Sequence, residues 1–128
     1  MKILIVGAGA VGFNLAMQLS KEGHDISVVE KSQDLVKRIS EKLDVRVVSG
    51  SASSPTILEA AEIKDTDMVL AVTNSDEINM VACMIAHNYG VKTKIARIRS
   101  PEFNDDQPFI HQNGFHIDHV VNPEKITV

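Results

Sequence analysis

Short apolar runs alternate with longer segments of helical spacing along most of the chain. Each run is rich in Val and Ile and has no continuous polar face. Runs of this kind are typical of strands in a parallel sheet that is covered on both sides. The pattern predicts six strands, at residues 3–6, 26–29, 45–48, 68–72, 94–98 and 119–121.

The segments between these runs carry signals for the start and the end of helices. Residues 10–21 have apolar side chains at helical spacing and are followed by Gly23, which suits a left-handed C-terminal cap. Ser32 and Ser54 stand where N-caps are expected, and Pro55 suits a first helical turn. Each predicted strand but the last is therefore followed by a crossover segment.

This alternation predicts an α/β fold, a Rossmann-like doubly wound parallel six-stranded sheet with helices on both faces. The length of 128 residues and the hydrophobic content of 44% suit one compact domain. In such a sheet the ligand crevice lies at the carboxyl ends of the strands. The least regular segment is 101–113, in which Pro108 must begin a new turn or break a helix.

Residues 76–88 form a predicted helix that is apolar around much of its circumference. One apolar series, expected to face the core, comprises Ile78, Val81, Ala82 and Ile85, and the other, expected to face a second subunit, comprises Met80, Cys83, Met84 and His87. One sheet face cannot bury both series, and methionine suits a surface that repacks. The helix therefore predicts a homodimer or a larger assembly, and the alternative is an inner helix that residues 101–113 cover.

Composition and charge narrow the class of partner. The formal net charge of -4 shows no excess of Lys and Arg for a phosphate backbone, so no nucleic acid is expected. A single cysteine excludes an internal disulfide, and the N-terminal sequence has no export signal, so a cytosolic location is expected. No apolar run approaches the roughly 20 residues that span a bilayer. A membrane is expected to matter only through a partner.

The first predicted strand runs directly into the sequence GAGAVG. Gly7 permits the tight turn, Gly9 lets a pyrophosphate approach the backbone, and Gly12 lets the helix pack close to the strand. The amide groups at the helix start, at Ala10 and Val11, would face the phosphates. Such glycines can also serve packing alone. Their place between a strand and a helix favours dinucleotide binding.

The second predicted strand ends in Val28, Val29 and Glu30, at the spacing expected for the acidic residue that holds a ribose. A carboxylate at Glu30 would repel the 2'-phosphate of NADP, so NAD is favoured over NADP. Lys31 is adjacent and would soften that exclusion if it faced the ligand. ATP or ADP would satisfy the same glycines and carboxylate and stays open as a ligand.

Polar residues follow the other predicted strands where the crevice is expected: Ser51 after the third, Thr73 and Asn74 after the fourth, and Arg97 and Arg99 at the fifth. The period-two spacing of the arginines places them on one face of an extended segment. Guanidinium groups there suit a diphosphate or a carboxylate of another subunit.

Several motifs resemble, in order and spacing, the TrkA N-terminal domain family, also called RCK or KTN domains. They are GAGAVG, VVE, GSASSP, AVTNSDEINMVACMIA, IARIRSP and DHVVNPE. The resemblance covers essentially the whole chain, and AVTNSDEINM followed by ARIRSP is more specific than the glycine motif. It implies a regulatory NAD(H)-binding domain that forms a homo-oligomer, a dimer or a tetramer, beneath an integral membrane potassium-transporting subunit, on the cytoplasmic face of the membrane.

The resemblance also implies roles for single residues. Gly7, Gly9 and Gly12 would contact the pyrophosphate, Glu30 the adenosine ribose, Ser51 and Ala52 the adenine edge, Thr73 and Asn74 the middle of the dinucleotide, and Arg97 the nicotinamide or phosphate side. This chain departs from the family at Ser51, where many relatives have aspartate. Members of the family continue into further lobes, so residues 1–128 are expected to be one module of a longer subunit.

The rival class is an enzyme, the cofactor-binding half of an NAD-dependent dehydrogenase. Hydride transfer needs a group that moves the substrate proton beside the nicotinamide. His87 lies on a predicted helix, and His111, His116 and His119 have neither a paired carboxylate nor, with Cys83, a zinc spacing. The six strands and their crossovers leave no substrate domain. The sequence therefore predicts a binding module without a catalytic or a metal site.

Overall fold

The computed structural model describes residues 1–103, 106–111 and 114–122, which form one six-stranded parallel sheet with helices on both faces. The strands are β1 Lys2–Val6, β2 Asp25–Glu30, β3 Arg46–Ser49, β4 Met68–Ala71, β5 Thr93–Arg97 and β6 His119–Val121. Their order in the sheet is β3-β2-β1-β4-β5-β6, and each neighbouring pair is parallel. This order reverses between β1 and β4, as a doubly wound fold requires. The predicted fold class is confirmed.

The helices begin and end where capping residues stand. The four α-helices are α1 Ala10–Lys21, α2 Gln33–Lys42, α3 Pro55–Ala60 and α4 Asp76–Asn88. Ser32, Ser54 and Ser75 each accept a hydrogen bond from a backbone N–H in the first turn of the helix that follows. Gly23 follows the end of α1 with a φ of 90°, so the left-handed cap is confirmed.

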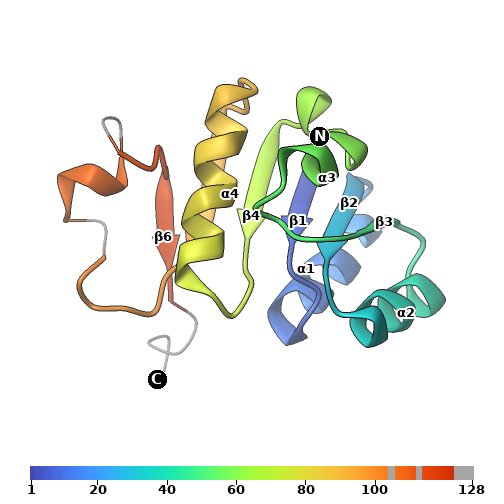
Figure 1. Ribbon diagram of the computed structural model, residues 1–128. Coiled ribbons are helices and arrows are strands. Elements are labelled where there is room, and N and C mark those ends of the chain that lie inside the picture. Colours follow the sequence, from blue (N-terminus) through green and yellow to red (C-terminus); the bar gives the residue numbers. More distant parts are fainter. Residues whose placement is uncertain (104–105, 112–113, 123–128) are drawn as a thin grey trace.

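Helices lie on both faces of the sheet (Figure 1). Two apolar clusters, one on each face, pack these helices against the strands. The cluster on one face joins the strands to α1 and α2, through residues such as Phe13 and Ile39. The cluster on the other face joins the strands to α3 and α4, through residues such as Leu58 and Met80.

The chain between β5 and β6 contains a short 3-10 helix, η2, at Pro108–Ile110. Pro108 therefore begins a new turn, which is the first of the two alternatives that the sequence predicts. Ile98, Ile110 and Ile117 from this part of the chain belong to the same apolar cluster as α4. Residues 104–105 and 112–113 of the irregular segment 101–113, and residues 123–128 with the end of the DHVVNPE motif, lie outside the described residues.

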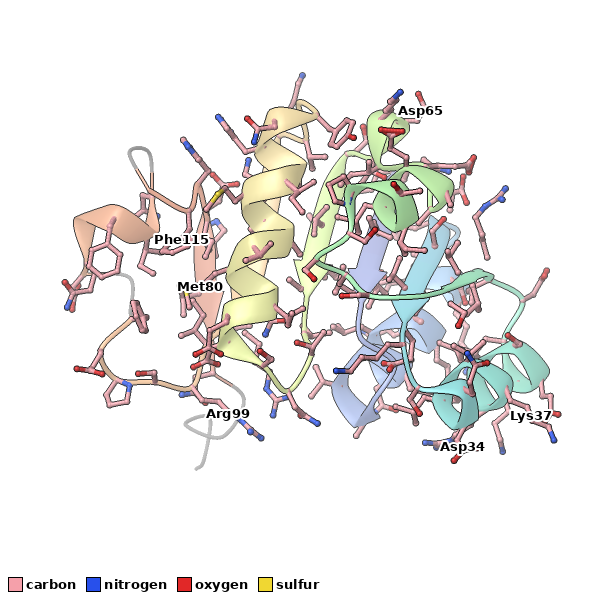
Figure 2. The ribbon with its side chains drawn as sticks, in the orientation of Figure 1. Asp34, Lys37, Asp65, Met80, Arg99 and Phe115 are labelled. Atoms are coloured by element: carbon pink, nitrogen blue, oxygen red, sulfur yellow. The ribbon has the colours of Figure 1, made fainter. Side chains whose placement is uncertain are left out.

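The prediction about the two faces of α4 is partly wrong. Met80 and Cys83, expected at a subunit surface, are 4% and 0% exposed. They are core residues because the chain that follows β5 packs on this flank of the helix, where Figure 2 shows Met80 and Phe115 on the side of α4 toward β6. Of that series, Met84 and His87 are exposed, whereas Ile78, Val81 and Ile85 of the expected core series are half-buried.

Candidate functional site

A cleft of about 300 Å³ lies at the carboxyl ends of the strands. Its lining includes nearly all of the residues that the sequence predicts for a ligand, namely Gly7, Gly9, Val11, Glu30, Ser51, Ala52, Thr73, Asn74 and Arg97. It also includes Gly50 and Ser75, which follow the third and fourth strands where the crevice is expected, and Leu35 and Ile78, which were not predicted to lie there. Ala10 is exposed and Gly12 is buried, and neither lines the cleft. Residues far apart in the sequence thus meet at one crevice.

The three glycines after β1 differ in what surrounds them. Gly7 has a φ of 105°, and a Cβ atom there would lie 3.0 Å from the Thr73 backbone nitrogen. A Cβ atom at Gly12 would lie 1.8 Å from the Gly7 carbonyl oxygen, so α1 packs directly on the turn. A Cβ atom at Gly9 would meet no heavy atom within 4 Å. Gly7 and Gly12 therefore serve the turn and the packing, and Gly9 faces open space.

The N-terminus of α1 differs from those of the other α-helices. Gly9 is its N-cap and no side chain accepts a hydrogen bond there, whereas a serine caps each of the other three; as in α3, the first turn holds no acidic residue. The first N–H groups of a helix have no partner within the helix and carry a partial positive charge. Since Gly9 and Val11 line the cleft, this helix start offers the cleft donors that suit a phosphate.

Glu30 ties the glycine turn to the start of α2. Its Oε1 atom accepts a hydrogen bond from the Ala8 backbone N–H at 2.7 Å, and its Oε2 atom accepts one from the Ser32 N–H at 2.8 Å. The side chain is half-buried at the edge of the cleft. A carboxylate has about four acceptor positions, so two remain for hydroxyl groups of a ligand. Glu30 therefore shapes the glycine turn as well as facing the cleft.

The end of β3 forms the wall beside Glu30. The Gly50 N–H donates to the Glu30 carbonyl oxygen at 3.0 Å, which continues the strand ladder to this point. Ala52 is buried and Ser51 is half-buried, and the Ser51 hydroxyl lies 2.8 Å from the Ser53 hydroxyl. This wall presents small side chains and a hydroxyl, with no carboxylate at Ser51.

Arg97 and Arg99 lie in different surroundings, although the spacing predicts one shared face. Arg97 is 8% exposed, lines the cleft, and donates from Nη1 to the Asn74 Oδ1 atom at 3.2 Å. Arg99 is exposed and lies outside the cleft lining, and Figure 2 shows it at the lower edge of the molecule. β5 ends at Arg97. After this end, the Asp76 carboxylate accepts hydrogen bonds from the backbone N–H groups of Arg99 and Ser100, each at 2.9 Å. The period-two alternation therefore stops there.

Asn79 is a residue of the site that sequence reasoning missed. It is fully buried in α4, and its Oδ1 atom accepts hydrogen bonds from the Thr73 N–H at 2.9 Å and the Thr73 hydroxyl at 2.7 Å. Its Nδ2 atom donates to the carbonyl oxygens of Thr73 at 3.1 Å and Arg97 at 2.7 Å. The signal in the sequence was a polar amide among the apolar positions of a helix.

The histidines of the described chain lie away from the cleft lining. His87 at the end of α4 stacks on His116 with ring centroids 3.6 Å apart. Although His87 is exposed, partial desolvation of its ring is the largest of the influences that lower its pKa below the ordinary value, and the charge of His116 is the next. Among the described residues, the ionisable side chains that line the cleft are Glu30, Lys31 and Arg97. The cleft thus offers hydrogen-bonding and charged contacts rather than a histidine for proton transfer.

Comparison with known proteins identifies relatives along nearly the whole chain. The family described as the TrkA-N domain matches residues 3–123. A protein of Vibrio alginolyticus named Trk system potassium uptake protein TrkA is 42% identical over 128 residues, and one of the same name from Haemophilus influenzae is 45% identical over 129. Each comparison covers 98% of this chain and 28% of the relative. The chain thus spans about a quarter of the length of these relatives, whose names are not those of dehydrogenases.

Solved structures share the fold. The TrkA-N domain of the inner membrane protein ybaL from Escherichia coli has a TM-score of 0.82 at 23% identity, over 97% of this chain and 88% of that one. The GsuK channel bound to NAD has a TM-score of 0.76 at 21% identity, over 94% of this chain and 21% of that one. GsuK bound to ADP has a TM-score of 0.76 at 21% identity, over 94% of this chain and 31% of that one.

Proposed function

Since the chain belongs to the TrkA-N domain family, we propose that it is a regulatory NAD(H)-binding domain of a potassium uptake system. In this role it controls a membrane potassium transporter in response to the nucleotide that it holds. The observation that carries the proposal is the cleft in which the open glycine turn, Glu30 and Arg97 meet. The names of the relatives, potassium uptake proteins, support the physiological role.

The cleft suggests how a dinucleotide would lie. The pyrophosphate would sit at Gly9 and the start of α1, where there is open space and there are helix N–H groups. The adenosine ribose would bind the remaining acceptor positions of Glu30, with the adenine against Ser51 and Ala52. The nicotinamide half would lie toward Thr73, Asn74 and Arg97. This orientation follows the strand order, because β2 and β3 lie on one side of β1 and β4 and β5 lie on the other.

NAD is the proposed ligand, and ATP or ADP is the alternative. GsuK has been solved with NAD and with ADP, so the shared fold accommodates both classes in that protein. Calorimetric titration of the chain with NAD, NADH, NADP, ATP and ADP tests the choice. We expect NAD and NADH to bind more tightly than NADP, because Glu30 repels a 2'-phosphate, although Lys31 in the same lining reduces this preference. Tighter binding of ATP than of either dinucleotide would contradict the proposal.

Regulation requires that the two redox forms bind with different strength to two states of the protein. The forms differ in the positive charge of the oxidised nicotinamide ring. Arg97 is a fixed cation on the wall proposed for that ring, and it would favour the uncharged reduced form. The Arg97 wall is therefore the proposed point at which the domain distinguishes NADH from NAD⁺.

We further propose that the domain acts as a homo-oligomer on the cytoplasmic side of the membrane, through an integral membrane potassium-transporting subunit. No helix among the described residues is long and apolar enough to cross a bilayer. On α4, Met84 is 37% exposed beside the half-buried Val81 and Ile85. Met84→Glu is expected to weaken the oligomer in light scattering without loss of the fold. A chain that stays monomeric with and without NAD would contradict self-assembly through α4.

A further inference from the structure

The carboxyl ends of β4 and β5 are joined by a side chain rather than by backbone hydrogen bonds. The ladder between these strands ends at the pair Ala71 and Ala96. Beyond that pair, the Asn79 side chain reaches from α4 to both segments of the backbone. Its amide forms hydrogen bonds with Thr73, after β4, and with the carbonyl oxygen of Arg97, at the end of β5. Asn79 therefore links the two segments beyond the last residue pair of the strands.

The hydrogen-bonding capacity of Asn79 is fully used. A primary amide offers two donors and two acceptor positions, and all four are engaged with Thr73 and Arg97. The Thr73 hydroxyl lies 2.7 Å from Asn79 Oδ1 and 3.1 Å from the Ser75 carbonyl oxygen, either of which can accept its proton, and it accepts from the Ser75 N–H at 3.1 Å. Because the amide is planar and 0% exposed, it holds the Thr73 turn at one separation from Arg97.

Both groups that Asn79 holds form the same wall of the cleft. Thr73 and Arg97 line it, and Asn74 lies between them through its hydrogen bond with the Arg97 guanidinium. Asn79 itself is not part of the lining. Its influence on a ligand is therefore indirect, through the placement of the wall.

We propose that Asn79 is a positioning residue that shapes the half of the cleft beyond the pyrophosphate, and that it contributes to the affinity for a dinucleotide but not for a mononucleotide. The inference rests on the proposed function, because it takes the nicotinamide half to lie against Thr73 and Arg97. The adenosine half lies across β1, at Glu30 and Ser51, and makes no contact that depends on Asn79.

A purely structural role for Asn79 leads to a different expectation. Removing this buried amide takes away its hydrogen bonds to backbone groups of Thr73 and Arg97, so a loss of thermal stability is expected in either case. A general loosening of the fold would lower the affinity for all ligands of the cleft to the same extent. If Asn79 has a positioning role, its loss would weaken the binding of NAD alone. The ratio of the NAD affinity to the AMP affinity therefore separates a positioning role from a purely structural one.

The experiment is a calorimetric titration of the unaltered chain and of Asn79→Ala with NAD and with AMP. We expect Asn79→Ala to lower the affinity for NAD by about tenfold and to change the affinity for AMP by less than about twofold. The matched control is Thr66→Val, which removes a buried hydroxyl whose hydrogen bond to the Glu62 carbonyl oxygen lies at the opposite end of the sheet. It is expected to lower the melting temperature and to leave both affinities unchanged.

A second variant keeps the test decisive if Asn79→Ala does not fold. Asn79→Asp keeps the size and the acceptor bonds from Thr73, and it loses the donation to the Thr73 and Arg97 carbonyl oxygens when the carboxyl is ionised. It is expected to show the same selective loss of NAD affinity. Equal losses for NAD and AMP, or no loss, in a folded variant would overturn the role of Asn79 alone. Failure of the unaltered chain to bind NAD would overturn the proposed function and this inference together.

Discussion

At the amino ends of the strands, charged side chains pair with one another and also hold the backbone N–H groups of Lys2 and Lys94, whereas at the carboxyl ends polar side chains mostly hold backbone groups. Near the amino ends, Lys2 pairs with Asp25 at 3.1 Å and with Glu62 at 2.8 Å, and Arg46 pairs with Glu62 at 3.2 Å. At the carboxyl ends, Glu30 and Asp76 each accept hydrogen bonds from two backbone N–H groups.

This difference shows how the loops at one end of a sheet are held in place around a cleft. The half-buried Lys2 and its exposed partner Asp25 satisfy each other's charge, and pairs that are exposed to solvent contribute little to stability. Loops that surround a cleft cannot bond across it, so side chains from elsewhere in the chain must accept and donate in place of the missing partners. We therefore expect substitutions at the carboxyl ends to change ligand affinity and those at the amino ends to leave it unchanged.

Gly9→Val is expected to have the largest effect on affinity. A Cβ atom at Gly9 would meet no heavy atom within 4 Å, so the fold is expected to be kept, but the branched side chain would fill the space proposed for the pyrophosphate. The affinity for NAD should fall by about two orders of magnitude or more in calorimetry. Asn14→Val places the same side chain on an exposed position of α1 and should bind as the unaltered chain does. Normal binding by Gly9→Val would refute the proposed path of the ligand.

Glu30→Ala is expected to have the next largest effect. A charge-assisted bond to ribose hydroxyls contributes ~1.5 to 3 kcal/mol, so NAD affinity should fall by about one to two orders of magnitude. The Ala8 and Ser32 N–H groups also lose their acceptor, and the free energy of unfolding should fall by about 1 to 3 kcal/mol. Chemical denaturation and calorimetry measure the two effects. Glu41→Ala, at an exposed glutamate of α2, is the control. Unchanged affinity in a folded Glu30→Ala would remove Glu30 from the ribose site.

Arg97→Met sharpens the comparison within the cleft itself. If Arg97 disfavours the charged nicotinamide ring, the unaltered chain binds NADH more tightly than NAD⁺ by about threefold or more, and the variant brings this ratio toward one. Arg99→Met is the matched control, because Arg99 is exposed and outside the cleft lining. A ratio that does not move in Arg97→Met would place the discrimination elsewhere.

Glu62→Gln at the amino ends is expected to have the smallest effect. A hydrogen bond from Lys2 is the largest of the influences that lower the pKa of Glu62 below 4.5. Its contribution to stability is therefore present above pH 4.5 and is lost as the pH falls through the lowered pKa. Thermal melts should show a weaker acid dependence for Glu62→Gln, with NAD affinity at neutral pH unchanged. A clear loss of affinity would break the separation between the two ends.

Much of the fold could be predicted because its signals are local. The helix bounds 10–21 and 76–88 match α1 and α4, and each predicted strand bound lies within one residue of the observed one. Caps such as Ser32 act on the next few residues, and the roles of Gly7 and Gly12 follow from the short path between a strand and a helix. The convergence of Glu30, Thr73 and Arg97 also followed from topology, because parallel strands bring their carboxyl ends together.

The sequence by itself determined the period of each element, the places where elements begin and end, and hence the edge of the sheet at which a ligand would bind. Only the tertiary structure decided which flank of α4 is covered, that Arg97 and not Arg99 enters the cleft, and that Asn79 joins Thr73 to Arg97. Periodicity reports that a face is apolar or polar, but the partner of that face comes from residues distant in the chain. The contact of Asn79 with Arg97 spans 18 residues of sequence, a separation over which no local preference acts.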